Sequence, residues 1–392
     1  MTTYPTFVAE RLTDFVCAWQ QAQPHEMVLH QAKRLLLNQL KASAEASRQP
    51  AGLQLLAQAA LAAGVAGPGT GVALWWSGLR VPRARAALLH GQLLEQLDYG
   101  DTHLPSQTSI TAALLPDLLA LGEIGRHGGA RVLTALLVGV EVALAARDLT
   151  PAPHVASVAR DLGAAASRCT LLGLTRAATS AALAPMCAAW PQAAGDAPQA
   201  GAALADLDDF RRVHEIALHC RPLPVAALAP VEAALALRAQ AGGRSLQRLR
   251  LAVWPGSSKA PQRDELLLDS VATAWLMGQF TADERLAACR EHPTTRRLRD
   301  TIHLWRDDRL PGVHASRLEA WFDDGGQEAV EIDFFLGSPA HPLCDSQLCE
   351  LFRSAADDVV LPRRSGEILQ ALWGLDRSAD VGGLLALLRR PA

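Results

Sequence analysis

The sequence predicts a mainly helical protein in which a large all-helical domain is joined to a smaller α+β lid domain. Three observations lead to this fold class. Apolar residues recur at helical spacing through the first half, alternate at strand spacing after about residue 243, and return to helical spacing from Gln347 onward. Hydrophobic residues make up 49% of the 392 positions, which is ample for the cores of two domains.

The helical pattern begins near the N-terminus. Apolar side chains fall on one helical face along Val8–Trp19 and again along Val28–Leu40. Further helices are predicted over 107–122, 128–147 and 155–171. Clusters of glycine and proline separate these runs, as expected for turns between helices.

The second domain is predicted from a change of period. Residues 248–254 alternate between apolar and polar or small side chains, which is strand spacing. A second strand pair is expected at Leu318–Phe322 and Ala329–Phe335, joined by Asp323–Gly326. An Asp-Gly pair favours a hairpin turn because glycine tolerates positive φ. The helices expected between these strands cover 264–278 and 281–291.

Charge and composition exclude several classes of function. The net charge of −3 favours neither nucleic acid nor an anionic membrane surface as a partner. The most apolar stretches, Leu53–Ala63 and Val132–Ala146, are interrupted by glutamine or glutamate and are predicted to be buried helices, not membrane spans. The first twelve residues lack a basic flank followed by an apolar run, so no secretory signal is expected.

Cysteine and lysine usage suggest the cellular context. The seven cysteines are scattered and include no CxxC pair, which favours reduced thiols in a cytoplasm. Of the 37 basic residues, all are arginine except Lys33, Lys41 and Lys259. Together with abundant alanine, leucine, glycine and proline, this bias suggests a GC-rich bacterial genome.

Two motifs are poor candidates for cofactor or metal binding. The run Gly67–Gly71 is rich in glycine but lacks a following Lys-Ser/Thr pair, so phosphate binding is not predicted. His214, His219 and Cys220 lack both a helical ligand spacing and a second ligand pair, so no metal site is predicted. We expect no organic cofactor.

Several segments, taken in order, carry a resemblance to a known family. Ala86–Gly91 leads into Leu97-Asp98-Tyr99-Gly100-Asp101-Thr102-His103, followed by Gly129–Arg147 and by His154–Leu174. The later segments are Ser270–Gln279, His292-Pro293 and Pro342–Arg353. Together they resemble the MmgE/PrpD family, whose members include 2-methylcitrate dehydratase, cis-aconitate decarboxylase and iminodisuccinate epimerase.

The resemblance implies an architecture and an assembly. It places the helical domain at 1–215, the α+β lid at 216–344, and a return to the helical domain at 345–392. It also implies a homodimer formed through the helical domain, with the active site between the domains. Family members move a proton at a carbon next to a carboxylate and then expel water or carbon dioxide, which needs a base and groups that stabilise the developing charge.

The resemblance also nominates site residues. Asp98 and Thr102 match the family's aspartate and threonine, and their i, i+4 spacing would put them on one face if the segment is helical. His154 matches the family histidine and is the expected proton-transfer group. His103, His219 and Arg221 are the candidates for substrate binding.

At several positions this sequence differs from the family's motifs. Gly100 stands where the family has an aspartate, and Leu104–Ser106 stands where it has a His-Pro-Ser run. The family's catalytic lysine is absent, because no lysine occurs between Lys41 and Lys259. A substrate with three carboxylates would be poorly neutralised without these groups. We therefore expect a less anionic substrate than methylcitrate or cis-aconitate.

Each candidate has a simpler structural reading. Asp98 would cap a helix or form a salt bridge, Thr102 would bond a nearby carbonyl, and His154 would lie on the surface. His103 and His219 would be solvated or core histidines, and Glu141 a paired structural carboxylate.

The predicted function is therefore a cofactor-independent lyase or isomerase acting on a small carboxylate-bearing metabolite. The alternatives are a catalytically degenerate relative that binds a ligand or a partner protein, and a purely structural dimer. A closed polar pocket around the candidate residues distinguishes the enzyme from the other two.

Overall fold

The computed structural model describes residues 4–63, 71–149, 156–189, 201, 204–257, 261–282 and 292–389. The fold is mainly helical with a smaller α+β part, which confirms the predicted fold class. The chain forms two compact units. The helical unit contains Met1–Gln96, Gly100–Ile216 and Cys344–Ala392, and the α+β unit contains Leu97–Tyr99 and Ala217–Leu343.

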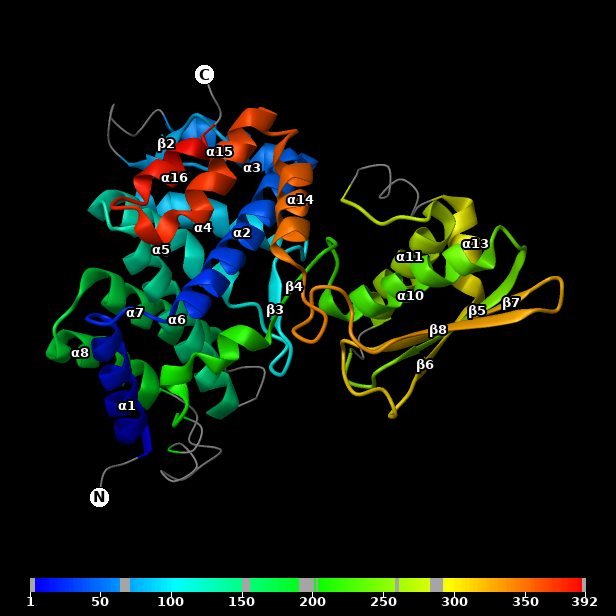
Figure 1. Ribbon diagram of the computed structural model, residues 1–392, viewed down its shortest axis with the longest axis horizontal. Coiled ribbons are helices and arrows are strands. Elements are labelled where there is room, and N and C mark those ends of the chain that lie inside the picture. Colours follow the sequence, from blue (N-terminus) through cyan, green and yellow to red (C-terminus); the bar gives the residue numbers. More distant parts are fainter. Residues whose placement is uncertain are drawn as a thin grey trace. The chain divides into compact units, whose positions relative to one another are not determined.

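The helical unit is built around α2, with other helices on several sides (Figure 1). Every residue of α2 from Leu35 to Ser47 is buried. The α-helices of the helical unit are α1 (Tyr4–Trp19), α2 (Glu26–Arg48), α3 (Pro50–Ala63), α4 (Arg83–Glu95), α5 (Thr111–Gly125), α6 (Gly129–Leu149), α7 (Ala156–Leu172), α8 (Arg176–Ala188), α14 (Asp345–Ala356), α15 (Pro362–Trp373) and α16 (Gly382–Leu387).

Short elements complete this unit. They are β1 (Val72–Ala73), β2 (Arg80–Val81) and β3 (Asp101–His103), with the 3₁₀ helices η2 (Leu207–Asp209), η3 (Arg211–Glu215) and η4 (Leu375–Arg377). Strands β1 and β2 pair antiparallel. The chain leaves the helical unit within β4 (Ile216–Leu218).

Helix α6 is the most apolar element of the helical unit. It is long and apolar enough to cross a membrane by length and composition, but 89% of its most apolar window is buried inside the protein. Its residues from Val132 to Arg147 are all buried, which confirms the prediction of a core helix. Glycine allows α7 to approach closely, because a Cβ added at Gly163 would lie 2.5 Å from the carbonyl oxygen of Gly139.

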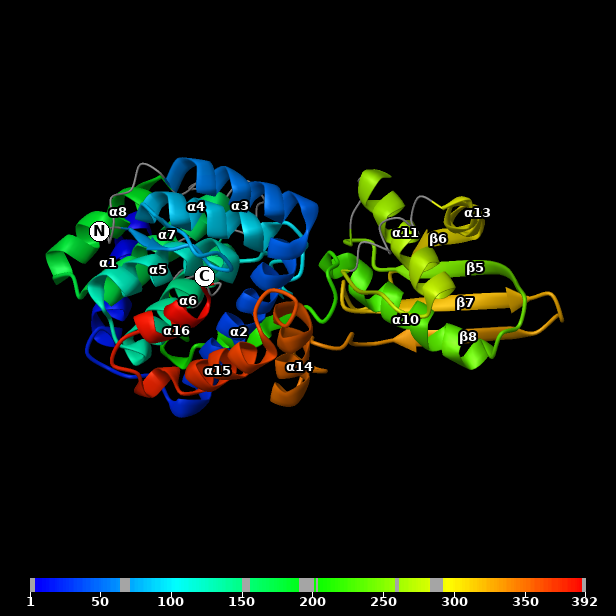
Figure 2. The ribbon, with the colours of Figure 1, turned by 90° about the horizontal axis from the view of Figure 1, so that it is seen from above.

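The α+β unit consists of one four-stranded sheet with helices on one side (Figures 1 and 2). The strands follow the order β6-β5-β7-β8, with β5 parallel to β6 and the other two pairs antiparallel. The bounds are α10 (Val225–Ala241), β5 (Leu246–Val253), α11 (Pro261–Met277), α13 (Pro293–Thr301), β6 (Ile302–Arg306), β7 (Ser316–Phe322) and β8 (Gln327–Ile332).

The predicted strands and turn of this unit are confirmed. Strand β5 covers the alternating segment up to Val253, and β7 and β8 form the expected hairpin, although β8 ends at Ile332, three residues before the predicted end. Gly325 supplies the positive φ of 82° in the turn. The helix predicted over 264–278 is α11, whereas most of the helix predicted over 281–291 lies outside the described residues.

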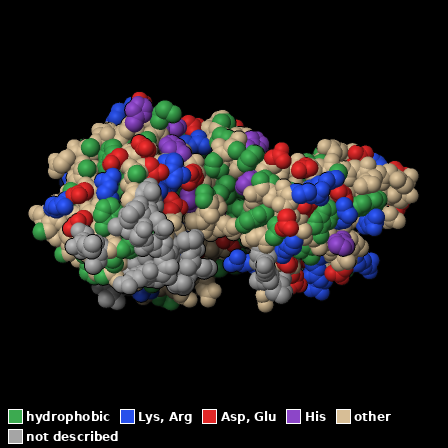
Figure 3. All heavy atoms as spheres, turned by 90° about the horizontal axis from the view of Figure 1, so that it is seen from below, with side chains coloured by type: hydrophobic (Ala, Val, Ile, Leu, Met, Phe, Trp, Pro, Cys, Tyr) green, Lys and Arg blue, Asp and Glu red, His purple; other side chains and the backbone are tan. Residues whose placement is uncertain are grey.

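The sheet face opposite these helices carries arginines stacked on aromatic rings. The guanidinium carbon of Arg248 lies 4.2 Å from the ring centre of Trp321, and that of Arg250 lies 4.0 Å from Trp305. Figure 3 shows basic and hydrophobic side chains side by side on this unit. Stacking lets the arginines cover apolar ring surface, and the Arg250 guanidinium also donates to the buried Glu319 carboxylate at 2.7 Å.

Candidate active site

The segment Leu97–His103, which carries two of the catalytic candidates, is not helical. Helix α4 ends at Glu95, Asp98 adopts a left-handed φ of 49°, and β3 begins at Asp101. The condition under which Asp98 and Thr102 would share one helical face is therefore not met. The backbone turns sharply at Asp98, a residue type that tolerates this conformation. Asp98 is exposed and belongs to the α+β unit, whereas Thr102 is buried in the helical unit.

Helix α2 anchors the start of β3. The side-chain amide of Asn38 donates to the carbonyl oxygen of Gly100 at 2.6 Å. The Asn38 side-chain oxygen accepts a hydrogen bond from Lys41 Nζ at 2.8 Å. Both side chains are fully buried. The Lys41 ammonium is therefore linked through Asn38 to the segment that carries Thr102.

Asp101 fixes the next position. Its carboxylate is buried and accepts a hydrogen bond from Ser109 Oγ at 3.1 Å. Burial raises the pKa of Asp101, and the hydrogen bond from Ser109 partly opposes this shift. Asp101 therefore ties the strand to the loop that precedes α5.

His103 is fixed through both ring nitrogens. Nε2 lies 3.0 Å from Glu215 Oε2 and Nδ1 lies 2.8 Å from Ser106 Oγ. Burial lowers the pKa of His103, and the Glu215 carboxylate opposes the shift. With Nε2–H donating to the carboxylate, Nδ1 is the acceptor for Ser106. This geometry leaves no ring nitrogen of His103 for a ligand.

The α+β unit contains the other two substrate-binding candidates. His219 is buried, and its Nδ1 donates to the carbonyl oxygen of Asp98 at 2.7 Å. That bond helps to hold the left-handed turn at Asp98. Arg221 is half-buried and donates to Cys220 Sγ at 3.2 Å. Asp98, His219 and Arg221 thus belong to one unit, and Thr102 and His103 to the other. His154 lies outside the described residues.

An ion-pair network centred on Arg212 adjoins His103, and of its members only Glu141 was expected from the sequence to be paired. The Arg212 guanidinium donates to Glu141 at 2.8 Å, to Asp148 at 2.6 Å and to Asp206 at 2.9 Å. Glu141 is completely buried, and burial raises its pKa to about 7 although Arg212 opposes the shift. The prediction that Glu141 is a paired structural carboxylate is confirmed.

Part of this network could have been suspected from the sequence. Glu141 interrupts the most apolar helix, so its charge required a buried partner. The partner Arg212 lies 71 residues away, and nothing local in the sequence identifies it.

Comparison with known proteins decides the family. The model of the MmgE/PrpD N-terminal domain matches residues 10–206. This chain belongs to the MmgE/PrpD family. The match covers the segment with Asp98 and Thr102 and also His154, and it ends before Ala217–Leu343, the main part of the α+β unit. A search of the curated proteins finds none that matches.

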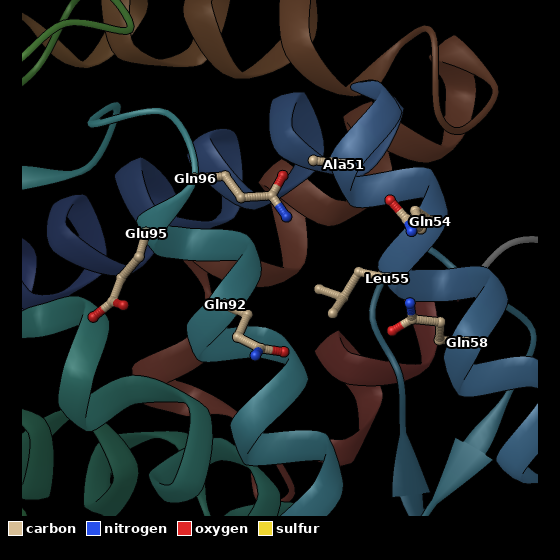
Figure 4. Close-up of a pocket in the computed structure, with 7 residues that line it drawn as sticks. All are labelled: Ala51, Gln54, Leu55, Gln58, Gln92, Glu95 and Gln96. Carbon is tan, nitrogen blue, oxygen red and sulfur yellow. The ribbon is translucent and has the colours of Figure 1, made fainter.

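The helical unit also has a surface pocket of about 410 Å³ between α3 and α4 (Figure 4). Leu55 and Gln96 point into the space between the two helices, and none of the residues nominated by the family resemblance lines it. Within the described ranges, no group of three or more His, Cys, Asp or Glu side chains is arranged to hold a metal ion.

Proposed function

We propose that this protein is a cofactor-independent lyase or isomerase of a small carboxylate-bearing metabolite. The MmgE/PrpD family is known for dehydratase-like lyase activity. That chemistry needs a group that removes a proton from the carbon next to a carboxylate and polar groups that hold the substrate or the departing water.

The fixation of Gly100 and strand β3 carries the proposal. Asn38, Asp101 and His103 are all buried, and each uses a side-chain hydrogen bond to hold this strand. Burying polar groups is costly unless each is paired, so apolar side chains would make a cheaper scaffold. The arrangement supports a role in which the Thr102 hydroxyl must occupy a defined position.

The residues take distinct parts in this proposal. His154 accepts the proton from the substrate carbon and returns it, since an imidazole titrates near neutrality. Asp98 and Thr102 orient the substrate or the leaving water, and His219 and Arg221 bind a carboxylate. His103 is better suited to positioning Thr102 than to touching substrate, because both of its ring nitrogens bond within the protein.

The missing family lysine limits how many carboxylates the expected substrate carries. No lysine occurs between Lys41 and Lys259, so fewer cations than in other members are present to neutralise carboxylates. A monocarboxylate or dicarboxylate fits this charge better than a tricarboxylate.

The test is an activity screen followed by one substitution. Purified protein is incubated with mono-, di- and tricarboxylates bearing a hydroxyl, an amino group or a double bond, and products are followed by NMR. We expect turnover of a mono- or dicarboxylate, and a loss of roughly 10²-fold in His154→Ala, the usual worth of a general acid–base group. His303→Ala, which removes an exposed histidine of the α+β unit, is the control.

Two results would contradict the proposal. Wild-type turnover by His154→Ala would remove this histidine from the mechanism. Binding of a carboxylate by calorimetry, without any conversion across the panel, would favour the alternative of a ligand-binding relative.

A further inference from the structure

The 3₁₀ helix η3 connects the core of the helical unit to the strand that carries Thr102. Its side chains Arg211, Arg212 and Glu215 form what we call the η3 clamp. The residue before the helix, Phe210, has a left-handed φ of 50° and is buried, with its ring centre 4.8 Å from that of Trp19. The clamp therefore starts from a fixed position in the core.

One end of the clamp is held by three carboxylates. Arg212 is 1% exposed, and its guanidinium contacts Glu141 and Asp148 of α6 and Asp206 before η2. A buried guanidinium with several carboxylate partners is geometrically well defined, because its donors form a planar fork. Arg212 thereby locks η3 to α6.

The other end of the clamp reaches the strand next to Thr102. Arg211 donates to Asp206 at 2.7 Å and also to Glu215 Oε1. The second oxygen of Glu215 accepts from His103 Nε2 at 3.0 Å, and the Glu215 carbonyl oxygen accepts from the Leu104 amide at 3.4 Å. Side chain and backbone of one residue thus hold both His103 and Leu104.

We propose that Glu215, supported by Arg211 and Arg212, is a positioning residue that sets the place of the Thr102 hydroxyl through His103. The catalytic part of this inference rests on the proposed function. The continuous series of contacts runs from α6 through Arg212, Asp206, Arg211 and Glu215 to His103. Thr102 directly precedes His103 in the strand. Release of His103 therefore shifts the Thr102 hydroxyl. A displacement of about 1 Å at a reacting group can cost roughly 10²-fold in rate.

The experiment compares three variants of the full chain. Glu215→Ala removes the carboxylate, and Glu215→Gln keeps an oxygen that accepts from His103 Nε2. Glu367→Ala is the matched control, because Glu367 also pairs with an arginine four residues away but belongs to α15 and not to the η3 clamp. Amide hydrogen exchange of His103 and Leu104 is measured for each, with kcat and KM on the substrate found in the screen.

The expected result is specific to the clamp. In Glu215→Ala, the amides of His103 and Leu104 exchange about 10-fold faster and kcat/KM falls at least about 10-fold, mainly through kcat. Glu215→Gln recovers most of both losses, and Glu367→Ala matches the wild type in both. If Glu215→Ala does not fold, Arg211→Gln replaces it, because Arg211 is exposed and supports the same carboxylate.

Failure of the clamp and failure of the proposed function give different results. Unchanged exchange at His103 and Leu104 overturns the inference whether or not a substrate is known. Faster exchange with wild-type kcat/KM also overturns it, since the clamp would then be only structural. Faster exchange in a protein that converts no carboxylate supports the positioning of the strand and contradicts the proposed function alone.

Discussion

The buried carboxylate of Glu141 predicts a specific dependence of stability on pH. Its side chain is 0% exposed, and one oxygen accepts from Arg212 at 2.8 Å. The other oxygen makes no hydrogen bond to the part of the chain that the structure describes. Glu141→Gln keeps an oxygen acceptor for Arg212 and removes the charge, so it isolates the cost of burying that charge.

The magnitude follows from the pKa. Burial raises the pKa of Glu141 from 4.5 to about 7. Between these values the folded protein holds a proton on Glu141 that the unfolded chain has released. The contribution of this group to the free energy of unfolding therefore has its maximum below pH 4.5 and is lost as the pH rises through 7. At roughly 1.4 kcal/mol per pKa unit, the total is about 3 kcal/mol.

Urea unfolding at several pH values from 4.5 to 8 measures this contribution. Other titrating groups act on both proteins and cancel in the difference between wild type and Glu141→Gln. The wild type should lose about 3 kcal/mol of unfolding free energy between pH 4.5 and pH 8 that Glu141→Gln does not lose. The variant should therefore gain about 3 kcal/mol relative to the wild type over this range. A difference that does not vary with pH would mean that Glu141 stays ionised throughout and that Arg212 fully offsets its burial.

Three further predictions concern packing and assembly. Gly163→Ala should destabilise the protein by about 3 kcal/mol in chemical unfolding, because the new Cβ would meet the carbonyl oxygen of Gly139 at 2.5 Å, whereas Gly366→Ala, with open space around it, should be neutral or stabilising. His90→Ala should cost about 2 kcal/mol at pH 8 to 9, because His90 stacks on Trp75 and accepts the Trp75 backbone N–H at 3.0 Å. Burial lowers the pKa of His90 from 6.5 to about 3, so only the unfolded chain binds a proton there and the cost should shrink as the pH falls from 6.5 to 5; a cost that is the same at pH 5 and pH 9 would contradict this. Light scattering at micromolar concentration should show a homodimer, as the family resemblance implies, and a monomer would count against it.

The fold was predictable from the sequence where burial alone determines the pattern. Helix α6 is buried on all sides, so its apolar run identifies it despite Glu141. Strand β5 has one face on the helices and one face with arginines, so its alternation is clear. The Asp-Gly turn after β7 follows from glycine's access to positive φ, which is a local property.

The candidate site was less predictable because its geometry depends on long-range contacts. The family resemblance nominated Asp98 and Thr102 but not the turn between them. That turn is supported by His219, which lies 121 residues from Asp98 in the sequence. Helical spacing was a reasonable default after α4, and bonds from distant elements override such local preferences. Likewise, Glu215 meets His103 across 112 residues.

Two polar residues of α2, Asn38 and Lys41, hold the start of β3. The side-chain amide of Asn38 donates to Gly100, so its oxygen must face the other way, where it accepts from Lys41. Lys41 thereby orients the amide that holds the start of β3. Periodicity marked Leu36 and Leu40 on this helix but gave no reason to single out the polar residues between them, since only the folded chain brings Gly100 beside Asn38.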